Sequence, residues 1–222
     1  MLLTLDAFRA SLATVASNRR DPDYQPYHDN GQLTAIDMRN NVERQGMLRR
    51  FRMSLDLYLN SPTRFNGFTW SEAALEELYR IVEICRSRGI DLKVIVPPTH
   101  AAHAESIRAR GLWNQYERWK RRLAAVTPYW DFSGYNRVTM EPLAEQMSNY
   151  WDISHYRSSV GDVMLSRIFS DGPDAPADGF GWRVTEENVE RALDDAVAAR
   201  EDWRADNGEL LALIESIIER SE

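Results

Sequence analysis

The run Leu-Lys-Val-Ile-Val at residues 92–96, which stops at Pro97-Pro98, constrains the fold of this chain most. A short β-branched run bounded by proline is typical of a strand buried on both faces of a parallel sheet. A second strand is predicted over residues 129–132, where Ser133-Gly134 ends it. Apolar residues at helical spacing precede the first run and fill the interval between the two. The order helix, strand, helix, strand predicts an α/β domain.

The helix before the first strand has start and stop signals. Thr69 and Glu72 match a capping box, in which both side chains bond free amide groups at the helix start. Gly89 is a natural end for this helix. Helical patterns resume over 101–110 and 113–126. Two strands alone cannot form a sheet covered on both faces, so the sheet needs more strands than this sequence supplies.

The flanking segments carry weaker signals. We expect a helix over 5–15, a polar loop or weak hairpin over 18–40, a helix over 42–59, a helix over 159–169, a linker over 172–181, and acidic helices over 185–204 and 208–220. These patterns predict four parts: N-terminal helices and loop (1–68), the α/β part (69–170), a linker (171–184) and an acidic helical extension (185–222).

Composition excludes several classes of protein. The 27 Lys and Arg face 34 Asp and Glu, and the basic stretches 49–52 and 120–122 fall in amphipathic patterns, which favours solvated helix faces over a nucleic-acid site. No apolar run of about 18 residues is present, so we expect no membrane span. The first residues lack the pattern of a signal peptide. The single cysteine, Cys85, permits neither an internal disulfide nor a cysteine-based zinc cluster.

The strongest chemical signal is Asp152-Ile153-Ser154-His155. A carboxylate three residues before a histidine can accept a hydrogen bond from the ring, which fixes the tautomer and leaves the other nitrogen free as a base. The alternative is that Asp152 caps the following helix and His155 is simply packed.

Other residues could line the same site. Ser133 follows a predicted strand and Ser154 lies within the motif, although serine also favours such loops for turn chemistry alone. His100 lies at the carboxyl end of the first strand, where ligands bind in α/β sheets. His100 and His103 could hold zinc only with a third ligand, which no spacing marks, so we predict no metal and no cofactor. Trp151 is the best candidate for a cleft wall.

An ordered set of segments carries a family resemblance: Val94-Ile95-Val96-Pro97-Pro98-Thr99-His100, Trp119-Lys120, Trp130-Asp131-Phe132-Ser133-Gly134, Tyr150-Trp151-Asp152-Ile153-Ser154-His155-Tyr156 and Gly161-Asp162. Over residues 69–169 the chain resembles the C-terminal half of SGNH/GDSL hydrolases, especially their DltD-like cell-envelope branch. There a late Asp-x-x-His block supplies two members of a Ser-His-Asp triad. The family's Gly-Asp-Ser turn is missing here, as are its later oxyanion blocks.

The resemblance implies a three-layer flavodoxin-like sheet of SGNH type, incomplete at its N-terminal side, with a helical C-terminal extension. It implies an esterase or O-acyltransferase of the bacterial cell envelope or periplasm, acting on an acylated polysaccharide or other envelope polymer. His155 would be the base, Asp152 would orient it, and the serine would come from outside this chain, as in a truncated protein. The alternative is a non-catalytic binding module. The acidic C-terminal helices would either pack on the domain or dock a protein partner.

Overall fold

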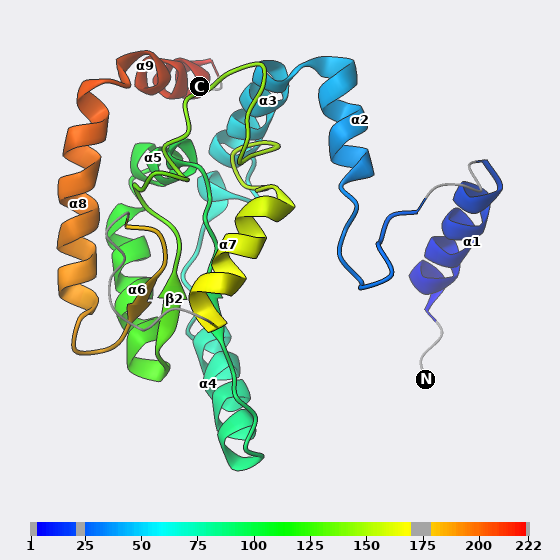
Figure 1. The fold of residues 1–222 in the computed structure, drawn as a ribbon. Coiled ribbons are helices and arrows are strands. Elements are labelled where there is room, and N and C mark those ends of the chain that lie inside the picture. The colour runs from blue at the N-terminus through cyan, green and yellow to red at the C-terminus, as the bar shows by residue number, and fades with distance from the viewer. Residues whose placement is uncertain (1–3, 21–24, 170–178, 221–222) are drawn as a thin grey trace. The chain divides into compact units, whose positions relative to one another are not determined.

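The computed structural model describes residues 4–20, 25–169 and 179–220. The chain divides into two compact units, Met1–Asn41 and Val42–Glu222 (Figure 1). The candidate site lies wholly in the second unit.

The first unit contains α1 (Leu5–Arg20) and the start of α2 (Ile36–Gln45). Between them, Tyr27 and Leu33 form an isolated antiparallel bridge around a turn at Gly31, whose φ of 82° suits glycine. This bridge is the weak hairpin predicted within 18–40. The apolar stripe predicted for the first helix is at least half exposed at every position. Its members are Leu5, Phe8, Leu12 and Val15.

The single helix predicted over 42–59 is wrong, because the chain breaks it at Gly46. There α2 ends and α3 (Met47–Asn60) begins. Gly46 has φ 80° and ψ 152°, a conformation that L-residues with a side chain avoid. The backbone N–H of Met47 donates to Glu145 Oε2 at 3.2 Å, which fixes the start of α3.

The second unit contains a small mixed sheet in the order β1-β2-β3. The strands β1 (Val94–Val96) and β2 (Tyr129–Asp131) are parallel, as predicted. The predicted burial of β1 on both faces is wrong, because Val94 is half-buried and Ile95 is exposed. The third strand, β3 (Trp182–Val184), pairs antiparallel with β2 and was missed, since it falls in a stretch predicted to be linker. The mixed α/β class is therefore confirmed.

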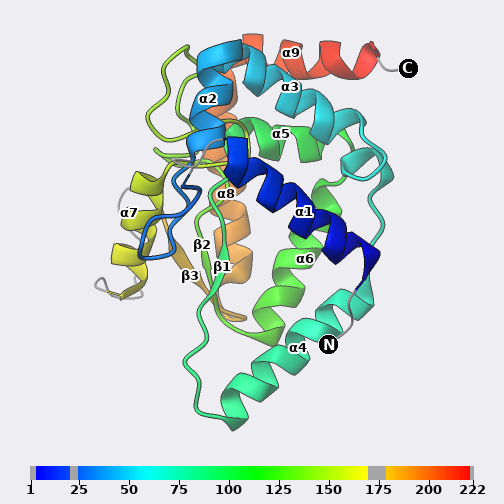
Figure 2. The ribbon, with the colours of Figure 1, turned by 90° about the vertical axis from the view of Figure 1, so that its right-hand side faces the viewer.

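Helices surround this sheet. They are η1 (Phe65–Gly67, a 3-10 turn), α4 (Glu72–Ser87), α5 (Ala101–Ala109), α6 (Trp113–Val126), α7 (Ser158–Phe169), α8 (Val189–Ala205) and α9 (Gly208–Glu219). Figures 1 and 2 show α7 on the opposite side of the sheet from α6 and α8. The capping box predicted at Thr69 is wrong, because the N-cap of α4 is Ser71, whose Oγ accepts from the Ala74 amide at 3.3 Å.

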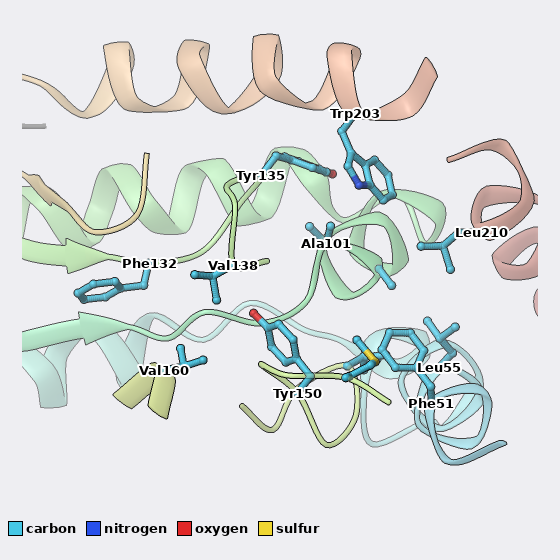
Figure 3. Packing of buried hydrophobic residues seen from close by; sticks show 14 of the residues in the cluster. Phe51, Leu55, Ala101, Phe132, Tyr135, Val138, Tyr150, Val160, Trp203 and Leu210 are labelled. Atoms are coloured by element: carbon cyan, nitrogen blue, oxygen red, sulfur yellow. The ribbon is translucent and has the colours of Figure 1, made fainter. Parts of the chain in front are cut away.

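The largest core cluster joins distant parts of the sequence (Figure 3). Phe51 and Leu55 of α3 lie in one cluster with Leu210, Ile214 and Ile217 of α9. A second cluster places Val189 and Leu193 of α8 with residues of β1, β2, β3 and α6. The apolar residues of the acidic C-terminal helices are thus largely buried within their own chain. Most of the predicted linker 172–181 lies outside the described residues.

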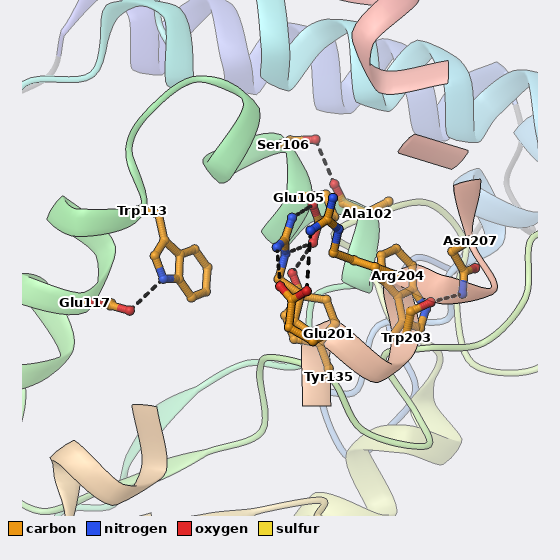
Figure 4. A network of polar contacts seen from close by, with 11 residues as sticks. Ala102, Glu105, Ser106, Trp113, Glu117, Tyr135, Glu201, Trp203, Arg204 and Asn207 are labelled. Carbon is orange, nitrogen blue, oxygen red and sulfur yellow. Dashed lines mark hydrogen bonds and ion pairs between the residues drawn. The ribbon is translucent and has the colours of Figure 1, made fainter. Parts of the chain in front are cut away.

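A buried ion pair ties α8 to α5. Glu105, 3% exposed, accepts from Arg200 Nε at 2.6 Å and from Arg200 Nη2 at 2.8 Å. The hydroxyl of Tyr135 donates to the same carboxylate (Figure 4). A buried carboxylate needs such partners, because an unpaired charge in the interior is costly.

Among the described residues, no helix has the length and apolar content that crossing a membrane requires.

Candidate functional site

The Asp152–His155 pair forms in the structure. His155 Nδ1 lies 2.8 Å from Asp152 Oδ1 and 2.9 Å from Oδ2. Nδ1–H therefore donates a hydrogen bond to the carboxylate, and Nε2 is the ring nitrogen that keeps its lone pair. Asp152 is 3% exposed, whereas the His155 side chain is 54% exposed. A buried carboxylate thus holds a solvent-facing imidazole.

Asp152 is held by several donors besides the imidazole. Arg50 Nη2 donates to Asp152 Oδ2 at 2.8 Å, and Arg50 Nε donates to the Trp151 carbonyl at 3.1 Å. The backbone amides of Ser154 and His155 both donate to Asp152 Oδ1 at 3.0 Å. These contacts fix the carboxylate on both of its oxygens.

The contact lowers the pKa of Asp152 and raises the pKa of His155. Burial alone would raise the pKa of Asp152, but the hydrogen bond from His155, the amide of Ser154 and the charge of Arg50 together lower it to about 2. The hydrogen bond to Asp152 raises the pKa of His155 above its ordinary value, against the opposing effect of partial burial. At neutral pH Asp152 is ionised, and the imidazole is a stronger base than an isolated histidine.

The loop that carries the pair is anchored beside the carboxyl end of β1. Tyr150 and Tyr156 form an antiparallel bridge across it, and the Tyr150 hydroxyl donates to the Pro98 carbonyl at 3.0 Å. The amide of His100 donates to the carbonyl of Ile153 at 2.9 Å, and Ile153 is fully buried. The motif predicted from sequence therefore lies at the sheet edge where α/β proteins place their ligands.

Ser154 contacts Nδ1 of His155, whereas a nucleophile would have to contact Nε2, the nitrogen that can accept its proton. Its Oγ is 3.1 Å from His155 Nδ1 and 3.2 Å from Asp152 Oδ1. In the part of the chain that the structure describes, no hydroxyl lies within hydrogen-bond distance of His155 Nε2. Trp151 is half-buried in the same loop, and the Arg157 guanidinium stacks over its ring at 3.6 Å.

Ser133 belongs to a separate polar cluster. Its Oγ donates to Asp131 Oδ1 at 2.7 Å and accepts from Lys120 Nζ at 3.0 Å, with the Tyr116 hydroxyl at 2.9 Å. Burial opposes the charge of Lys120, but the carboxylate of Asp131 at 2.7 Å outweighs it and raises the pKa of Lys120. Lys120 is therefore an ammonium at neutral pH and cannot act as a base toward Ser133.

This cluster corrects one sequence interpretation. The stretch 120–122 was predicted to be a solvated helix face, yet Lys120 is 4% exposed and only Arg121 and Arg122 fit that prediction. A cavity of about 210 Å³ borders Ser133 and Lys120.

His100 is buried and both of its ring nitrogens are engaged. Nδ1 accepts from the Ala102 amide at 3.1 Å, which caps α5, and Nε2 lies 2.7 Å from the Glu141 carbonyl. Burial lowers the pKa of His100 to about 4, so the ring is neutral. Within the described ranges no three His, Cys, Asp or Glu side chains are grouped so as to hold a metal ion.

Sequence reasoning missed the role of Arg50. It lies in the basic stretch 49–52, which was interpreted as a solvated face, and it contacts a carboxylate 102 residues further along the chain. No feature of the sequence around Arg50 indicates this partner.

No protein-family model matches this chain, and neither a curated protein nor a solved structure is detectably similar to it.

Proposed function

We propose that this chain is an acyl-transfer module of the SGNH type, an esterase or O-acyltransferase of the bacterial cell envelope, in which His155 is the general base and Asp152 orients it. The observation that carries the proposal is the Asp152–His155 pair. Nδ1 of the imidazole is held by a buried, ionised carboxylate, and the His155 side chain is half exposed. The flavodoxin-like three-layer fold and the acylated-polymer substrate belong to this proposal and rest on the family resemblance.

In this mechanism Nε2 takes the proton from an attacking hydroxyl while its oxygen adds to the ester carbonyl. The proton then passes to the leaving alkoxide as the ester bond breaks. The hydroxyl belongs to a water molecule or to a serine that comes from outside this chain. Asp152 stabilises the imidazolium that forms in between, whereas the like charge of Arg50 opposes it; the part of Arg50 is to hold the carboxylate in place.

Hydrolysis of p-nitrophenyl acetate tests this role. We expect the wild-type chain to hydrolyse the ester at least tenfold faster than His155→Ala, because proton transfer by a positioned base contributes about 10²-fold or more. Ser154→Ala is the matched control and should retain the wild-type rate within about twofold, since its hydroxyl lies on the Nδ1 side. Equal rates for the wild type and His155→Ala would contradict the proposal.

The pH profile separates an oriented base from an exposed histidine. Because Asp152 raises the pKa of His155, the acid limb of the wild-type rate should lie above pH 6.5, and Asp152→Asn should move it to lower pH. Fluorophosphonate labelling with peptide mapping then asks where the nucleophile is. A serine whose labelling disappears in His155→Ala would be the nucleophile.

A non-catalytic binding module is the second candidate, and one observation favours it: among the described residues, no hydroxyl lies opposite Nε2. In that case Asp152 and His155 only hold the loop 150–156 in place. His155→Ala would then change stability and leave ester hydrolysis unaltered.

A further inference from the structure

A second hollow of the molecule, whose lining includes neither Asp152 nor His155, is a cavity of about 450 Å³. Its walls come from α4, α5, α6 and the segment from Phe65 to Ser71, all within the unit Val42–Glu222 (Figure 2). Ligand pockets span about 300–1,000 Å³ and are mostly apolar with a few polar groups. The size and the walls of this cavity fit that description.

The lining is mostly aromatic and aliphatic, it contains no Lys, Arg, Asp or Glu side chain, and its polar members are Thr69, Ser71, Gln115 and His103. Trp119 and Tyr116 of α6 supply flat faces, and Leu75 and Leu78 of α4 supply aliphatic surface. A charged ligand would lose its hydration here without gaining a counter-ion, which is costly. The walls therefore select an uncharged molecule.

His103 and Gln115 are polar side chains of this cavity that have no hydrogen-bond partner among the described residues, and the ring of His103 is the one that packs among aromatic side chains. This ring packs edge-on against Tyr58 at 4.7 Å and Phe65 at 5.1 Å between centroids. Neither ring nitrogen has a hydrogen-bond partner among the residues that the structure describes. Burial lowers the pKa of His103 to about 4, so the ring is neutral and offers one N–H and one lone pair.

We infer that this cavity binds an uncharged apolar molecule that carries one hydrogen-bonding oxygen, with the oxygen at His103 and the apolar body against Trp119 and Tyr116. The volume of about 450 Å³ lies within the range of pockets that hold small organic ligands. The binding does not rest on the proposed acyl-transfer chemistry, because the cavity shares no residue with the Asp152–His155 pair.

Isothermal titration calorimetry with two probes of matched size tests the charge preference. The neutral ketone 2-acetonaphthone should bind with one-to-one stoichiometry, and the anion 2-naphthoate should bind at least tenfold more weakly. An absence of saturable binding by the ketone, or equal or tighter binding of the anion, would overturn the inference.

Two adjacent alanines of α4 locate the site. Ala74 lines the cavity and Ala73 does not, and both are exposed. Ala74→Trp should weaken ketone binding at least tenfold by filling the cavity, and Ala73→Trp should bind within about twofold of wild type. Circular dichroism checks folding, and Ala74→Leu carries the comparison if the tryptophan variant does not fold. Equal affinities of the folded position-74 and position-73 variants for the ketone would place the ligand elsewhere and refute the site.

His103→Phe tests the hydrogen bond. It should weaken ketone binding about three- to tenfold, the effect of one hydrogen bond. Binding of 2-ethylnaphthalene, which lacks the oxygen, should stay the same or improve. Equal weakening of both probes would assign His103 a purely structural role and contradict this part of the inference.

Discussion

Replacing Asp152 by asparagine removes the charge on which the candidate site is built while keeping the shape of the side chain. Asp152 accepts hydrogen bonds from His155, Arg50 and two backbone amides. Its pKa lies at about 2 in the folded chain, below the ordinary 3.8. One pKa unit corresponds to about 1.4 kcal/mol, so the ionised carboxylate stabilises the fold by roughly 2 kcal/mol at neutral pH.

The sign of the pH dependence follows from the lowered pKa. The unfolded chain binds a proton at higher pH than the folded chain, so the stabilisation is complete above about pH 4 and is lost as the pH falls toward 2. We therefore expect Asp152→Asn to lower the free energy of unfolding by roughly 2 kcal/mol at about pH 6. At about pH 2.5 the difference from wild type should have fallen to half or less.

Urea denaturation followed by circular dichroism measures both values. Asp162→Asn on α7 is the matched control, because Asp162 is exposed, and it should stay within about 0.5 kcal/mol of wild type at each pH. A difference between Asp152→Asn and wild type that is the same at both pH values would refute the reasoning. Equal losses of unfolding free energy in Asp152→Asn and Asp162→Asn would also refute it.

Two further changes probe the fold around the site. Lys120→Met leaves the carboxylate of Asp131 buried without its cation, so it should lower the free energy of unfolding by about 3 kcal/mol. Lys93→Met removes the cation of the exposed Lys93–Asp91 pair and should lower the free energy of unfolding by less than about 0.5 kcal/mol. Equal losses of unfolding free energy in the two methionine variants, measured by urea denaturation, would contradict this account. Gly46→Ala should cost roughly 2 kcal/mol, because φ 80° and ψ 152° strain an L-residue. Gly208→Ala, with open space around its Cβ, should stabilise by about 0.5 kcal/mol, and thermal melts that rank these two variants in the opposite order would refute the strain argument.

Local patterns predicted the parts of the structure that local chemistry determines. Asp152 and His155 lie three residues apart, so one turn of chain brings the carboxylate to the ring and the sequence predicted that contact. The β-branched run 92–96 likewise predicted the strand β1, but burial on both of its faces was wrong, because only Val96 is buried.

Contacts between distant residues escaped prediction. Arg50 reaches Asp152 across 102 positions, and nothing beside Arg50 in the sequence marks that partner. Lys120 was predicted to be solvated because Arg121 and Arg122 follow it, yet it is buried in an ion pair with Asp131. The strand β3 is three residues long, and pairing with β2 defines it more than propensity does.

The packing of α9 against α3 has a consequence for synthesis on the ribosome. Asn60 at the end of α3 donates to the carbonyl of Ile217 in α9, a contact that spans 157 positions. Until residues 208–219 have been made, the face of α3 formed by Phe51, Leu55 and Leu59 lacks much of its cover. Contacts that close so late slow folding and leave apolar surface open to aggregation in the meantime. The nascent chain should therefore depend on chaperones that shield apolar segments until α9 emerges.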